Sequence, residues 1–81
     1  MSNPKSGIWY VWQCRTAELG PGVPSQCMYE IVGGTATYTC PADPSGNPCV
    51  ASRVAGPLPT MLDANSWITS MMRQRGVWFS C

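Results

Sequence analysis

The chain has 81 residues, of which 11% are charged, and its formal net charge is +1 at pH 7. It contains five cysteines and no histidine, which excludes Ser-His-Asp and Cys-His catalysis and imidazole metal ligands. A chain of this length forms one domain, residues 1–81, whose thin core needs disulfides, a metal or partner subunits to be stable.

The first predicted strand covers residues 8–14. This run is rich in aromatic and β-branched side chains and follows Gly7. Both of its faces are largely apolar, so we expect the strand to be covered on both sides or to present one side to a partner. Residues 15–26 contain Gly20-Pro21-Gly22 and Pro24 and are predicted to form a loop.

A β-hairpin is predicted around Gly33-Gly34, because two runs of alternating residues, 27–32 and 35–40, flank this dipeptide. In this register Cys27 faces Cys40 on a non-hydrogen-bonded rung, where side chains approach closely and a cross-strand disulfide fits. The alternative is two buried thiols, since a shift of one residue in the register removes the alignment.

The segment after this hairpin, residues 41–48, is dense in turn-forming residues. It leads to Cys49, which could pair with Cys14 or with a cysteine of the hairpin; sequence alone does not choose the connectivity. Residues 50–59 are expected to be extended, because Pro57 and Pro59 interrupt a helix there.

A helix is predicted to begin after Thr60, with Thr60 as N-cap and Asp63 completing a capping box. Gly76 is the predicted helix stop, and residues 77–81 form a strand-like tail. Arg73 and Arg75 then lie near the helix end, where the dipole favours cations. The positions predicted to form the apolar stripe of the helix are Met61, Ala64, Trp67, Ile68, Met71 and Met72. The alternative is that Met71 and Met72, with Trp67, form an adaptable binding surface.

Together these elements predict a small α+β fold: an antiparallel sheet of three to four short strands with one C-terminal helix, stapled by disulfides. The cysteines expected in internal bridges are Cys14, Cys27, Cys40 and Cys49, which leaves Cys81 as a candidate for a cross-link between chains.

Metal and acid–base chemistry are not expected. The cysteines do not form the two C-x₂₋₄-C pairs typical of zinc sites, so no metal or other cofactor is predicted. Each carboxylate has a structural explanation as a cap, a turn or a polar-face residue, and the protein is therefore predicted not to be an enzyme.

The surplus of aromatic side chains favours contacts between chains, and the candidate interface residues are Trp9, Trp12, Trp78 and Phe79. The expected partners are the chain itself and other structural proteins of an assembly. No nucleic acid is expected, because the basic residues are scattered. No membrane is expected either, because the apolar runs fall short of the roughly 18 residues of a spanning helix.

Cysteine richness indicates an oxidising compartment, while no secretory leader is recognisable. These two indications predict a small accessory subunit of a phage-like virion, such as a cement, decoration or tail-associated protein, made in the host cytoplasm and oxidised after release. The alternatives are a secreted or periplasmic disulfide-rich binding module and a thiolate metal-binding domain.

Overall fold

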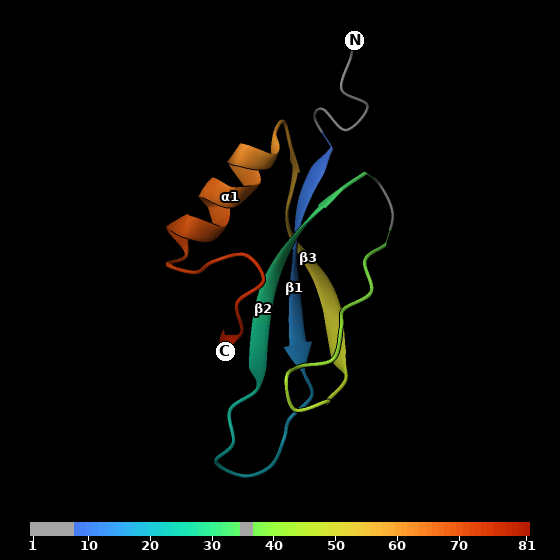
Figure 1. Ribbon diagram of the computed structural model, residues 1–81, viewed down its shortest axis with the longest axis vertical. Helices are drawn as coiled ribbons and strands as arrows, with labels where there is room; N and C mark the ends of the chain where they lie inside the picture. Colours follow the sequence, from blue (N-terminus) through green and yellow to red (C-terminus); the bar gives the residue numbers. More distant parts are fainter. Residues whose placement is uncertain (1–7, 35–36) are drawn as a thin grey trace.

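The computed structural model describes residues 8–34 and 37–81 (Figure 1). An antiparallel sheet in the order β3-β1-β2-β4 carries one helix, which confirms the α+β prediction. The elements in chain order are β1 (Trp9–Thr16), β2 (Gln26–Gly33), β3 (Cys49–Leu58), α1 (Met61–Ser70) and β4 (Phe79–Ser80).

The first two strands form the hairpin of this sheet. They pair so that Val11 lies opposite Ile31. Their connection turns at Gly20-Pro21-Gly22-Val23, where the Val23 N–H donates to the Gly20 carbonyl oxygen at 3.1 Å and Gly22 has a φ of 74°. Proline followed by a glycine of positive φ is the signature of a type II turn. The hairpin therefore closes in the segment that the sequence marked only as a loop.

The predicted hairpin around Gly33-Gly34 is wrong. Thr35 and Ala36 lie outside the described residues, while residues 37–40 have no strand structure and β2 pairs instead with β1 and β4. The reason is burial: the two most apolar strands take the two central positions, where both faces are covered. The threonine-rich run fits a strand locally, but pairing is decided by the packing of the whole sheet.

One face of the sheet is covered by α1, which lies beside the strands in Figure 1. Tyr29 is central to this layer: its ring lies 5.4 Å from that of Trp67 and 5.3 Å from that of Phe79. The buried residues of the cluster are Val11, Tyr29, Ile31, Ala64 and Ile68, against which Trp9, Ala55, Leu58, Trp67 and Phe79 pack.

The opposite face is covered by the segment 37–48, which Figure 1 shows on the other side of the strands from α1. Trp12 and Cys14 alternate with the core residues of β1 and so point to this face. A disulfide joins Cys14 to Cys40, and the Trp12 and Tyr38 rings are 6.2 Å apart. The face of β1 opposite to α1 is thus buried by a coil segment rather than by another strand.

The disulfides are Cys14–Cys40 and Cys27–Cys81, and Cys49 is free. The predicted Cys27–Cys40 pair, a Cys49 bridge and the cross-linking role of Cys81 are therefore all wrong. Cys27 lies two residues before Tyr29 in β2, so it shares the face of Tyr29 and Ile31 and points to the helix side of the sheet, to which β4 brings Cys81. Cys40 lies on the other side, within reach of Cys14.

The helix begins as predicted. The Asp63 N–H donates to Thr60 Oγ1 at 3.1 Å, which confirms Thr60 as the N-cap. The predicted capping box is wrong, because Asp63 Oδ2 accepts a hydrogen bond from the Thr60 hydroxyl at 3.0 Å and not from the Thr60 backbone N–H. The helix ends at Ser70, however, well before Gly76. Of the predicted stripe only Ala64 and Ile68 are buried and Trp67 is half-buried. Met61, Met71 and Met72 are exposed, the last two because they lie beyond the end of the helix.

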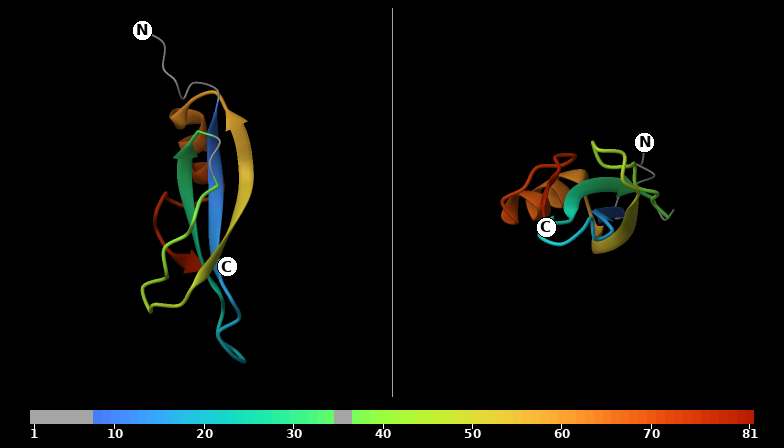
Figure 2. Two further views of the ribbon diagram at one scale, coloured as in Figure 1. Left: turned by 90° about the vertical axis from the view of Figure 1, so that its right-hand side faces the viewer. Right: turned by 90° about the horizontal axis from the view of Figure 1, so that it is seen from below.

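Gly56 lies where the backbone of β3 packs closely against β1, and β3 is a curved strand (Figure 2). It has a φ of 115°, and a Cβ at this position would lie 2.6 Å from Tyr10 Cδ1 and 2.7 Å from the Trp9 carbonyl oxygen. Gly56→Ala is expected to lower the free energy of unfolding by about 3 kcal/mol or more, from strain plus overpacking. Urea unfolding measures the change. Gly46→Ala is the matched control: its φ is 84° but nothing lies within 4 Å, so only about 1 kcal/mol of strain is expected. Equal losses would show that the close approach is unimportant.

Candidate interaction surface

The exposed side of α1 has an unusual composition. Asp63 is its only ionisable residue, and this side chain is engaged in the N-terminal cap. Leu62 is 73% exposed, and the other exposed positions between the ends of the helix are small and uncharged. A helix facing solvent normally carries charged residues on its outer side. We call the following exposed set the helix surface: Met61, Leu62, Ser66, Thr69, Ser70, Met71 and Met72.

The C-terminal turn of α1 adds two methionines to this surface. The Arg73 N–H donates to the Ile68 carbonyl oxygen at 3.2 Å and the Met72 N–H to that of Thr69 at 2.8 Å, which is a Schellman motif. Met72 occupies its left-handed position with a φ of 59°, and its side chain is 87% exposed. Glycine is the usual residue there, because a Cβ is strained in this conformation. Backbone strain of this kind concentrates at functional sites.

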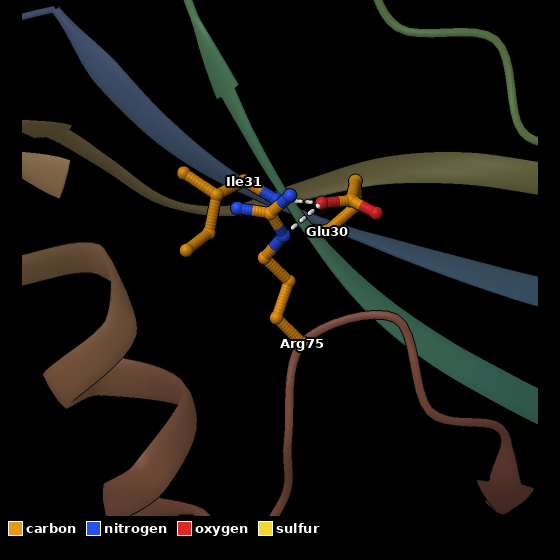
Figure 3. Close-up of polar contacts among 3 residues, drawn as sticks. All are labelled: Glu30, Ile31 and Arg75. Carbon is orange, nitrogen blue, oxygen red and sulfur yellow. Dashed lines mark hydrogen bonds and ion pairs between the residues drawn. The ribbon is translucent and has the colours of Figure 1, made fainter.

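Basic side chains near the helix surface are held by groups of the same chain. The Arg73 guanidinium lies 4.3 Å above the Phe79 ring. Arg75 Nε lies 2.9 Å from Glu30 Oε1, an oxygen that also accepts a hydrogen bond from the Ile31 N–H (Figure 3). The predicted dipole role of these arginines is wrong, since the last turn of α1 contains no basic residue.

The four predicted interface aromatics differ in accessibility. Trp12 is buried at 9% exposure beside Tyr38, and its Nε1–H has no hydrogen-bond partner among the described residues. Trp9 and Phe79 are half-buried and pack against the core. Trp78 is also half-exposed, although it is not part of the core cluster. Trp78 therefore remains a predicted anchor, whereas Trp12 serves the fold.

The sulfur atoms offer little to a metal, because four of the five are bonded to each other. Within residues 8–34 and 37–81 no group of three or more Cys, Asp or Glu side chains is placed to hold an ion, and no pocket is found. The same part of the chain contains no helix that is long and apolar enough to cross a membrane. The helix surface is thus the feature that calls for a functional explanation.

Asp43 organises the turn that leads into β3. Its Oδ1 accepts hydrogen bonds from the Asn47 N–H at 2.7 Å and the Ser45 N–H at 3.0 Å, and its Oδ2 accepts one from Asn47 Nδ2 at 3.1 Å. Burial acts to raise the pKa of this carboxyl, but the hydrogen bonds from Asn47, Ser45 and Gly46 together outweigh burial and lower the pKa below its ordinary value.

This lowered pKa predicts an acid-sensitive turn. Because the folded-state pKa lies below the unfolded value of about 3.9, the carboxylate stabilises the fold above that pH and the stabilisation disappears as the pH falls through the folded-state pKa. The difference in melting temperature between wild type and Asp43→Asn is expected to be largest near neutrality and to shrink in acid. Glu18→Gln, a change of an exposed loop carboxyl, is the control. A pH-independent difference for Asp43→Asn would contradict the prediction.

Leu62 is the residue of the helix surface that the sequence analysis missed as an interface candidate. Met71 and Met72 were considered there, with Trp67, as an adaptable binding surface, but the core stripe was preferred. The methionines were assigned to the core because their spacing matches a longer helix.

Comparisons with known proteins give no further guidance, since no family model, no curated protein and no solved structure matches this chain.

Proposed function

We propose that this protein is a non-catalytic structural subunit of a repetitive assembly, in the class of small accessory proteins of a phage-like virion. The observation that carries the proposal is the helix surface: Leu62 and Met72 are the most exposed large apolar side chains of the described chain. Exposed large apolar side chains at both ends of one uncharged helix face make that face a candidate site of association.

The composition of the helix surface suits close packing against another chain. Ser66, Thr69 and Ser70 are short and uncharged, so a partner can approach the helix without burying an unpaired charge. Methionine side chains adapt to irregular partner surfaces. In a particle built from many copies, weak contacts of this kind are multiplied by effective concentration.

The two disulfides also support the proposal. They connect the second face of β1 to the segment 37–48, and β2 to the C-terminus, so the thin core is closed without help from a partner. The subunit can therefore be rigid before it assembles, which lowers the entropic cost of association.

Sedimentation velocity over a range of protein concentrations tests the proposal. Wild type is expected to self-associate, and Met72→Gly is expected to weaken this association while raising the free energy of unfolding by about 1 kcal/mol, because glycine relieves the left-handed conformation. Leu62→Glu should abolish association. Val50→Glu, which places the same charge at an exposed site on β3, is the matched control and should associate like wild type.

A wild type that stays monomeric at every concentration would overturn the assembly proposal. The second candidate, a secreted or periplasmic binding module, would then be favoured, because its disulfides are equally expected and self-association is not. No observation favours a thiolate metal-binding domain, since Cys49 is the only described cysteine that is not in a disulfide.

A further inference from the structure

The segment 37–48 brings a free thiol and a disulfide to the same face of the sheet. Cys14 lies opposite Ala51 and Thr16 lies opposite Cys49 in the pairing of β1 with β3, so the side chains of Cys14 and Cys49 point to the same side. Diagonal neighbours of this kind have Cα atoms about 7–8 Å apart. Cys40, the partner of Cys14, covers this same face.

The Asp43 turn also brings Cys40 and Cys49 together. The Asp43 N–H donates to the Asn47 carbonyl oxygen at 3.0 Å, and the Asn47 N–H donates to Asp43 Oδ1 at 2.7 Å. The chain therefore reverses at this turn, with Cys40 on the incoming arm and Cys49 on the outgoing arm. The Cys49 thiol already points back along the turn, since its Sγ lies 3.8 Å from the Asn47 carbonyl oxygen.

We propose that Cys49 is an internal exchange partner for the Cys14–Cys40 disulfide, and that the chain can shift this bridge to Cys40–Cys49. The Cys49 thiol loses its proton to solvent, and the thiolate attacks Cys40 Sγ. The Cys40–Cys49 bond forms as the Cys14–Cys40 bond breaks, and the Cys14 thiolate takes up a proton. One disulfide and one thiol are present before and after, so the step needs no oxidant or reductant.

Attack at Cys40 follows from accessibility. Cys14 is fully buried at 0% exposure, whereas Cys40 is half-buried and belongs to a coil that can shift. A neutral Cys14 thiol also suits its buried position, because free cysteine behaves as a small apolar side chain. The shifted bridge closes the Asp43 turn on itself and releases residues 37–40 from their covalent link to β1.

The surroundings of Cys49 keep the exchange slow near neutrality. Burial, followed by the Asp43 carboxylate, raises the pKa of the Cys49 thiol above its ordinary value, and the hydrogen bond with the Asp43 backbone acts in the opposite direction. Arg15, the charged residue of β1 nearest this site, alternates with Cys14 and Thr16 and so lies on the other face. The attacking thiolate is therefore formed mainly in alkaline solution.

Thiol mapping tests the proposal. The native protein is incubated without oxidant at neutral pH and at a pH above about 9, where a thiol of raised pKa ionises. Each sample is then acidified to stop the exchange, unfolded in guanidinium chloride so that a buried Cys14 thiol can react, labelled with a maleimide at mildly acidic pH, reduced and digested with trypsin. Cys14 lies in the peptide that ends at Arg15, while Cys40 and Cys49 lie in the peptide from Thr16 to Arg53. The label is expected on the second peptide at first and to move to the first peptide in alkali. A label that stays on the second peptide, with circular dichroism unchanged, would overturn the proposal.

Two variants sharpen this result. Cys49→Ser should take no label on either peptide, which shows that the migration requires the Cys49 thiol. Cys14→Ser, oxidised during refolding, should form the Cys40–Cys49 bridge and show no free thiol by intact mass. Two free thiols in a folded Cys14→Ser protein would contradict the proposed reach of Cys49. Neither result depends on self-association.

Discussion

Replacing Cys27 and Cys81 together by alanine is expected to lower the free energy of unfolding by about 4 kcal/mol. The bridge spans a sequence separation of 54, against 26 for Cys14–Cys40, and in the chain-entropy model the longer loop gives the larger stabilisation. Small domains have total stabilities of about 5–15 kcal/mol, so this loss approaches the lower limit.

Loss of the Cys27–Cys81 bridge also destabilises the fold through the packing of the C-terminal segment, in addition to the loop entropy. β4 consists of Phe79–Ser80 alone, and two residues of pairing hold a strand poorly without a covalent link. Without the bridge the C-terminal segment can leave β2, and the packing of Phe79 on Tyr29 is lost with it. Loss of this aromatic contact adds to the entropic cost.

Urea unfolding followed by tryptophan fluorescence measures the change. The double variant Cys14→Ala/Cys40→Ala is expected to lose about 3.5 kcal/mol, slightly less than the first pair, and Cys49→Ala about 0.5 kcal/mol or less. If the Cys27/Cys81 variant were as stable as wild type, the bridge would not be what holds the C-terminus.

Local signals in the sequence were sufficient for β1, for the extended β3 and for the start of α1. The aromatic and β-branched run before Cys14 forms β1, the two prolines 57 and 59 match an extended β3, and Thr60 with Asp63 caps α1. Each of these depends on interactions within a few residues. The α+β class followed because the number and order of such elements leave few arrangements for a small chain.

The pairing of the strands and the connectivity of the disulfides could not be predicted from local sequence signals. Gly33-Gly34 satisfies the local rule for a two-residue hairpin, whereas Gly20-Pro21-Gly22 signals only a turn within a longer loop. The choice between them depends on which strands become central in the sheet. The disulfides follow this choice, because the register decides which face each cysteine occupies. The one wrong strand pairing therefore explains why the disulfide partners of Cys27, Cys40 and Cys81 were predicted wrongly.

The helix surface was hidden by a similar ambiguity. Apolar residues at helical spacing predict burial only while the helix continues, and α1 stops at Ser70. Met71 and Met72 then fall in the C-terminal turn, outside the sheet-facing stripe. Their exposure depends on where the chain turns towards β4, which is a tertiary feature without a local signature in the sequence.

Ile68→Ala is expected to lower the free energy of unfolding by about 3–4 kcal/mol, because it truncates a side chain of the core. Ile68 is 1% exposed and is the largest fully buried side chain of the described chain. It belongs to the cluster in which α1 packs against Val11, Tyr29 and Ile31. Truncation removes its transfer free energy and leaves a cavity that two sheet strands and a short helix cannot fill.

Leu62→Ala on the same helix is the matched control. Both changes remove a branched aliphatic side chain and gain the higher helix propensity of alanine, but Leu62 is 73% exposed, so its loss should change stability by about 0.5 kcal/mol or less. Urea unfolding of both variants separates the two sides of α1. If Leu62→Ala cost as much as Ile68→Ala, Leu62 would be buried in the isolated chain, and the helix surface could not be the free face that assembly requires. If only Leu62→Ala weakened self-association while only Ile68→Ala weakened folding, the inner and outer sides of this helix would have separate roles.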